Sequence, residues 1–142
     1  MRTAASTLPV APVALIAGGA MQSDTIGPLS RTDFVRYAGA GGDFNPIHHD
    51  ELMAAGAGLP SVFGMGMLHA GVLGSRLARW VGPDNVRAFS VRFTGQVWPG
   101  DELTLTGVVD AVSDGVAQIS MKVTRQTGDV VLTAKATAVV MA

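Results

Sequence analysis

The sequence predicts a single α+β domain in which an antiparallel sheet packs against one long apolar helix. The helix is predicted over residues 65–81, where apolar residues surround the helical axis and the only basic residues, Arg76 and Arg79, stand near the end. A helix that is apolar nearly all round is a buried helix. After residue 85 the hydrophobic period changes to two, the period of a strand. A buried helix followed by a run of strands indicates an α+β domain with the helix laid on one face of the sheet.

Four runs of alternating apolar and polar residues define the predicted strands, at 89–93, 103–107, 119–124 and 131–138. Turn-forming residues separate these runs, at 99–101, 113–115 and 127–129. Connections of this kind make consecutive strands antiparallel neighbours. The sequence therefore predicts a four-stranded meander.

Two short helices and a loop are predicted ahead of the long helix. Ser30 and Asp33 form a capping box, which opens a helix over residues 33–38. Glycines directly after residue 38 end it. A second short helix is predicted over residues 50–55, with Gly56 as its stop.

The first 20 residues are predicted to be a flexible or loosely packed leader, so that the domain comprises residues 21–142. Arg2 and the apolar run at 8–20 are similar to a secretory signal, but two prolines and the single preceding charge argue against one. The run is also too short to span a bilayer, and no longer apolar run follows it. We therefore expect no membrane partner.

The composition excludes several classes of function. Only 15% of the 142 residues are charged, the formal net charge is −1 and no basic stripe is present, so no nucleic-acid partner is expected. The absence of cysteine excludes disulfides and thiolate chemistry and fits a cytoplasmic location. Because charges are so sparse, we expect another protein chain to cover part of the surface.

Titratable groups concentrate between residues 42 and 50, which read G-D-F-N-P-I-H-H-D. Pro46 makes a continuous helix improbable here and favours a shaped loop, which places the carboxylate of Asp43 near the imidazole of His48. Such a pair can orient and deprotonate a water. The alternative is a structural loop, in which Asp43 caps a backbone amide and His48 is half buried.

A metal site is not predicted, because His48, His49 and Asp50 are adjacent and lack the ligand spacing of a zinc site. The start of the long helix is the second candidate site. First-turn amides of a helix have no internal partner, and Gly66 would let a substrate carbonyl approach such an amide, as in an oxyanion hole. The alternative reading of Gly66 is close packing of a strand against the helix.

Three stretches resemble the MaoC-like hydratases, the (R)-specific enoyl-CoA hydratases and related 3-hydroxyacyl-thioester dehydratases. The first, Y-A-G-A-G-G-D-F-N-P-I-H-H-D-E at 37–51, contains the complete G-D-x-N-P-x-H core of that family. The others are F-G-M-G-M-L at 63–68 and V-R-F-T-G-Q-V-W-P-G-D at 91–101. Together the resemblance covers residues 24–140.

The resemblance implies the hotdog fold, an antiparallel sheet wrapped around one long helix, and a site without metal or other cofactor. It makes Asp43 and His48 the catalytic pair that activates water, with Asn45 supporting the water or the imidazole. It also gives Gly66 the backbone amide that polarises the thioester carbonyl, flanked by Met65 and Met67. The family usually has histidine at the position of Met65, so a side-chain contribution there is expected to differ.

The implied reaction is reversible hydration of a trans-2-enoyl thioester to the (R)-3-hydroxyacyl thioester, with acyl-CoA or an acyl carrier protein as the carrier. A homodimer is expected, or a heterodimer with a second hotdog chain. One alternative is the catalytic subunit of a two-chain dehydratase for acyl-carrier-protein or steroid-CoA thioesters. Alternatives of another class are a hotdog acyl-CoA thioesterase and a non-catalytic thioester-binding subunit. The intact set of Asp43, Asn45 and His48 argues against the last.

Overall fold

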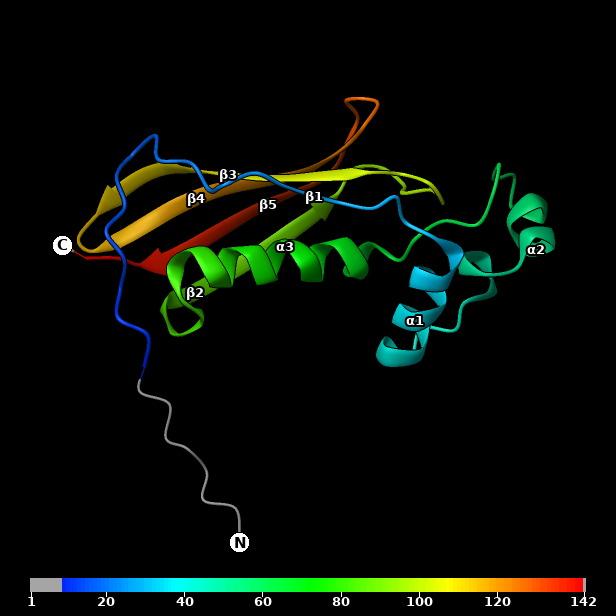
Figure 1. The fold of residues 1–142 in the computed structure, drawn as a ribbon, viewed down its shortest axis with the longest axis horizontal. Coiled ribbons are helices and arrows are strands. Elements are labelled where there is room, and N and C mark those ends of the chain that lie inside the picture. Colours follow the sequence, from blue (N-terminus) through cyan, green and yellow to red (C-terminus); the bar gives the residue numbers. More distant parts are fainter. Residues whose placement is uncertain (1–8, 142) are drawn as a thin grey trace, which may run out of the picture.

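The long apolar helix is α3, Gly66–Val81, which begins and ends within one residue of the prediction. The computed structural model describes residues 9–141 and places α3 along one face of a five-stranded sheet (Figure 1). Its buried side chains recur at the helical period and face the strands, which confirms the α+β prediction. The other elements are β1 Asp24–Ile26, α1 Arg31–Gly41, η1 Pro46–His48, α2 Glu51–Gly56, η2 Pro83–Asn85, β2 Val86–Phe93, β3 Leu103–Ser113, β4 Val116–Arg125 and β5 Val130–Val139.

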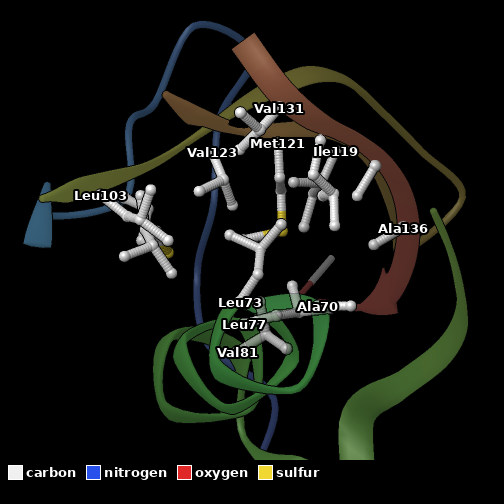
Figure 2. Close-up of a cluster of buried hydrophobic side chains, with 14 of the residues drawn as sticks. Ala70, Leu73, Leu77, Val81, Leu103, Ile119, Met121, Val123, Val131 and Ala136 are labelled. Atoms are coloured by element: carbon white, nitrogen blue, oxygen red, sulfur yellow. The ribbon is translucent and has the colours of Figure 1, made fainter. Parts of the chain in front are cut away.

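The core lies between α3 and the inner face of the sheet, as Figure 2 shows. Leu73 and Leu77 of the helix are fully buried there. They meet side chains from β3, β4 and β5, which include Leu103, Ile119, Met121, Val123, Val131 and Ala136. Because alternate residues of these strands point inward, the period of two in the sequence is the signature of this face.

The strand order is β1-β3-β4-β5-β2, with every neighbouring pair antiparallel. The predicted meander is correct for β3, β4 and β5 but wrong for β2, which pairs with β5 instead of β3. Three strand spacings therefore separate β2 from β3, about 14 Å. The connection at 94–102 is long enough to cross that distance, whereas a tight hairpin turn is not.

Hydrogen bonds fix the path of this crossing connection. Gly64 N donates to Val97 O at 2.8 Å, just ahead of α3. The buried carboxylate of Asp101 accepts hydrogen bonds from Trp98 N and from the side chains of Arg125 and Gln126. Burial raises the pKa of Asp101, but these hydrogen bonds outweigh burial and leave the pKa below its ordinary value. The segment at 94–101 is thus held against the start of α3.

The capping box of α1 is present as predicted: Ser30 Oγ accepts from Asp33 N, and the Asp33 carboxylate accepts from Ser30 N. The helix runs three residues farther than expected, to Gly41, and is capped by Gly42, whose φ of 72° lies in the left-handed region. The predicted helix at 50–55 is α2, with Asp50 as its N-cap. Both helices lie beyond the end at which α3 begins (Figure 1).

The predicted leader lies partly outside the described residues, which begin at residue 9. Its remainder makes hydrogen bonds to the domain: Val10 N donates to the Asp84 carboxylate at 2.9 Å and Gly18 N to Val109 O at 2.8 Å. The division at residue 21 stays a prediction. In the part of the chain that the structure describes, no helix is both long and apolar enough to cross a membrane.

Candidate active site

The loop that connects α1 to α2 holds the predicted acid and base in a fixed shape. Asn45 is the N-cap of η1, and its side-chain oxygen accepts a hydrogen bond from Ile47 N at 3.2 Å. Asp43 Oδ1 accepts one from Asn45 N at 3.2 Å. Pro46 then begins the 3₁₀ turn, which ends at His48. One oxygen of Asp43 is therefore used on the backbone, and Oδ2 remains for other contacts.

The buried imidazole of His48 is oriented by the segment that precedes α3. Its Nδ1 lies 2.7 Å from Phe63 O, and the Phe63 ring packs edge-to-face on the imidazole with 4.8 Å between ring centroids. A carbonyl oxygen only accepts hydrogen bonds, so Nδ1 must carry the proton in this contact. In the neutral ring, Nε2 is then an acceptor with a free lone pair. The contact with Phe63 O therefore leaves Nε2 of the neutral ring as a hydrogen-bond acceptor.

That lone pair faces Asp43. The distance from His48 Nε2 to Asp43 Oδ2 is 3.7 Å, too long for a direct hydrogen bond. A water held above the pair can contact both atoms. The Asp43 side chain is 47% exposed and that of His48 only 10%. The carboxylate is therefore in contact with solvent, whereas the imidazole is buried. Asp43 thus caps a backbone amide and also faces His48, and its part in deprotonating a water stays a prediction.

The start of α3 lies in the same cavity as the pair. Met65 is the N-cap residue and makes no side-chain capping hydrogen bond. Leu68 N donates to Met65 O at 3.0 Å, which leaves the amides of Gly66 and Met67 to other acceptors. Gly66 is packed closely: a Cβ added there would lie 2.6 Å from Cε1 of Phe93, at the end of β2. A strand residue thus packs closely against the Cα of Gly66, as the alternative interpretation expected. The role of the Gly66 amide as a donor to the thioester carbonyl stays a prediction.

The cavity has a volume of about 290 Å³. Five of the six predicted site residues line it, namely Asp43, His48, Met65, Gly66 and Met67. Asn45 does not, because its side chain turns to the backbone of η1. The lining residues that carried no predicted role are Phe63, Gly64, His69, Phe93, Gly95 and Gln96.

A larger hollow of about 600 Å³ lies on the outer face of β3, β4 and β5, but no histidine or carboxylate lines it. Within residues 9–141 no group of three or more His, Cys, Asp or Glu side chains is placed to hold a metal ion. The smaller cavity, beside the start of α3, is lined by two histidines, His48 and His69, together with the carboxylate of Asp43.

His69 is the one titratable residue among those lining residues without a predicted role. It lies on the buried row of α3 with Leu73 and Leu77 and is 1% exposed. Burial lowers its pKa from 6.5 to about 4, because the cavity wall disfavours the charged ring. The signal in the sequence was a lone polar side chain at helical spacing on an otherwise apolar face.

The lowered pKa of His69 predicts a pH-dependent stability. Between pH 6.5 and 4 the unfolded chain binds a proton on this ring and the folded protein does not, so the unfolding free energy falls as the pH drops through that range. The full loss amounts to about 3 kcal/mol. Urea unfolding at pH 7 and pH 4 should show that His69→Leu loses less stability than the wild type by about this amount. Equal losses in the two proteins would contradict the prediction.

A family model and several known proteins are similar to this chain. The family model of the MaoC like domain matches residues 16–131. Fatty acid synthase subunit beta from Aspergillus oryzae is 33% identical over 100 residues, which cover 68% of this chain and 5% of that protein. The chain thus spans only a small part of the length of the curated relatives it matches.

Two solved structures share the fold. The R-hydratase PhaJ1 from Pseudomonas aeruginosa, in its unliganded form, has a TM-score of 0.78 and 25% identity, covering 89% of this chain and 84% of that chain. A chain of the ChsH1-ChsH2 complex from Mycobacterium tuberculosis has a TM-score of 0.79 and 23% identity, covering 89% of this chain and 98% of its own. These likenesses confirm the predicted hotdog fold.

Proposed function

Because this chain belongs to the family of the MaoC like domain, we propose that it catalyses the reversible hydration of a trans-2-enoyl thioester to an (R)-3-hydroxyacyl thioester. The observation that carries the proposal is the cavity in which the Asp43–His48 pair faces the uncapped start of α3. Hydration needs a base for the water and a donor for the thioester carbonyl, and these two groups supply them. The family of this chain and its likeness to an R-hydratase support the reaction class and the stereochemistry.

The proposed step begins with a water held between His48 Nε2 and Asp43 Oδ2. The pair takes a proton from the water as its oxygen forms a bond to C3 of the enoyl group. The electron pair of the C2=C3 double bond moves toward the thioester, and negative charge develops on the carbonyl oxygen. C2 then takes a proton from the pair, which restores the carbonyl and completes the addition of water.

The start of α3 is proposed to stabilise the charge on that carbonyl oxygen. The amide of Gly66 has no acceptor within the helix, and the positive end of the helix dipole lies at the same point. A backbone donor of this kind is fixed before the reaction, so no reorganisation is needed as the charge develops. Met65 and Met67 flank the amide, and Asn45 is proposed to act by holding the loop in shape.

The test is incubation of the purified protein with crotonyl-CoA and with a longer enoyl-CoA, while both enoyl absorbance and free thiol are measured. Hydration predicts a loss of enoyl absorbance with no thiol release. Thiol release without a hydrated product would instead identify a thioesterase. Binding of the enoyl-CoA without either change would identify a thioester-binding subunit. The same assay with an enoyl–acyl carrier protein distinguishes the two carriers.

The second candidate within this chemistry is one subunit of a two-chain dehydratase. Apolar side chains are exposed on the loop before η1 and on α2, most of all Leu52 of α2, at 84%, and Phe44 of the loop, at 66%. The sheet also ends in β2, which pairs with β5 alone. A second hotdog chain would cover such a surface and strand edge, and the likeness to a chain of a two-component complex favours this candidate.

We predict that the purified chain forms a dimer. Closed twofold pairs are the commonest oligomers, so the homodimer is the expected result for the chain alone. Light scattering at micromolar concentration should then give twice the chain mass of 14.6 kDa. A monomer that acquires activity only when a second hotdog chain is added would favour the two-chain enzyme. A stable monomer with full activity would contradict both forms of the prediction.

A further inference from the structure

His69 is exceptional among the buried polar residues that the structure describes. The other three are satisfied: His48 by Phe63 O, Asn85 by Val81 O, and Asp101 by the Arg125 side chain among others. Neither ring nitrogen of His69 has a hydrogen-bond partner within residues 9–141. Native structures rarely leave a buried polar group unpaired, because its desolvation costs stability that nothing returns. An unpaired imidazole therefore calls for a functional explanation.

His69 lines the cavity from the buried row of α3. Its ring packs edge-to-face on Phe93, with 6.1 Å between ring centroids, and Phe93 also covers Gly66 one helical turn earlier. Other residues that line the cavity, among them Asp43, Met67 and Phe93, are exposed to solvent. His48 and Gly66 line the same cavity, and Gly66 precedes His69 by three residues on α3, so the two positions are neighbours on one side of the helix. An acyl chain that runs along α3 from a carbonyl at the Gly66 amide therefore lies within reach of the His69 ring.

We propose that His69 is a specificity-determining residue that hydrogen-bonds a hydroxyl or keto oxygen on the acyl chain, so that the site takes oxygenated enoyl thioesters in preference to plain hydrocarbon ones. The inference rests on the proposed function and names its substrate class.

The chemistry of the ring selects the substituent. A neutral imidazole offers one donor and one acceptor, which match the acceptor and donor of a hydroxyl group; a keto oxygen satisfies the donor alone. A carboxylate is disfavoured, because an uncharged ring does not compensate the burial of a charge. A plain acyl chain leaves both nitrogens unpaired, as they are in the free protein. From the cost of an unpaired buried group, we expect a preference of about 10- to 100-fold in kcat/KM.

The test compares trans-2-hexenoyl-CoA with its analogues that carry a hydroxyl group at C4, C5 or C6. The wild type should prefer at least one hydroxylated analogue by about 10- to 100-fold. His69→Leu, which keeps the size of the side chain and removes its polarity, should raise kcat/KM for hexenoyl-CoA and lower it for that analogue. His69→Gln, which keeps a donor and an acceptor, should retain part of the preference.

Two further arms keep the outcomes distinct. If hexenoyl-CoA is hydrated but the wild type shows no preference, or if His69→Leu keeps the wild-type preference, the inference about His69 is wrong and the proposed function stands. If no enoyl-CoA is hydrated, the proposed function fails. Calorimetric titration with hexanoyl-CoA and its matching hydroxylated analogue then still tests His69, which should favour the hydroxylated ligand in the wild type and lose that preference in His69→Leu. Thermal melting confirms that both variants are folded.

Discussion

Asp43→Asn is expected to lower the rate of enoyl-CoA hydration by about 10²–10⁴, and His48→Gln by a similar factor, because each removes a group that takes part in deprotonating the water. Asparagine keeps the shape of Asp43, and glutamine can still donate to Phe63 O, as Nδ1 of His48 does. Since both residues act on one water, the double variant should be little slower than the slower single variant. Steady-state hydration of crotonyl-CoA measures all three.

Matched controls separate the chemistry from general effects of substitution. His49→Gln changes the neighbouring histidine, which does not line the cavity. Asp114→Asn makes the same change as Asp43→Asn, but in the distant β3–β4 turn. The φ of Asp114 is 52°, a value that asparagine tolerates well. Both should keep wild-type rates, and all variants should melt near the wild type. If Asp43→Asn and His48→Gln hydrate crotonyl-CoA as well as these controls, or if both fail to fold, Asp43 and His48 form only a structural loop.

Gly66→Val is expected to lower kcat/KM for hydration by about 10²-fold or more, the loss typical of removing one oxyanion donor. The added side chain collides with Phe93, since even a Cβ lies 2.6 Å from Cε1 of its ring, and it also obstructs the approach of the thioester carbonyl. Phe93 is 48% exposed, so its ring can turn outward and the fold should survive. Hydration of crotonyl-CoA and thermal melting are the two measurements.

Gly71→Val is the control for this prediction. It makes the same change in the same helix, where an added Cβ meets no atom within 4 Å. Equal activity of Gly66→Val and Gly71→Val would overturn the oxyanion assignment. Two further variants then separate displacement of the Phe93 ring from loss of access to the amide. One carries Gly66→Ala alone, and the other carries both Gly66→Ala and Phe93→Ala. Recovery of activity in the double variant would mean that displacement of the ring, and not loss of access to the amide, causes the defect.

The fold was predictable wherever a local pattern determines it. The apolar period and the Gly82–Pro83 stop locate α3 within one residue, and the capping box locates the start of α1. The partner of β2 was not predictable, because a period of two shows which residues face inward and not which strand lies alongside. β1 was missed as well, since its three residues are too few to show a period.

The candidate site divides in the same way. The loop motif places Asp43 and His48 together, because Pro46 and Asn45 fix the path between them. The orientation of the imidazole could not be predicted, since it depends on Phe63 O, which belongs to another segment. The contacts of Phe93 with Gly66 and His69 join the end of a strand to the start of a helix. No spacing within either element encodes such a contact.

The most direct test of the central claim, that this chain adds water to an enoyl thioester, is the fate of the water oxygen. Crotonyl-CoA incubated with the protein in water enriched in heavy oxygen should yield (R)-3-hydroxybutyryl-CoA, with one heavy oxygen at C3 and the thioester intact. Mass spectrometry and chiral analysis of the product read both features. Heavy oxygen in a free carboxylic acid, with release of CoA, or an unlabelled enoyl-CoA recovered in full, would contradict the account.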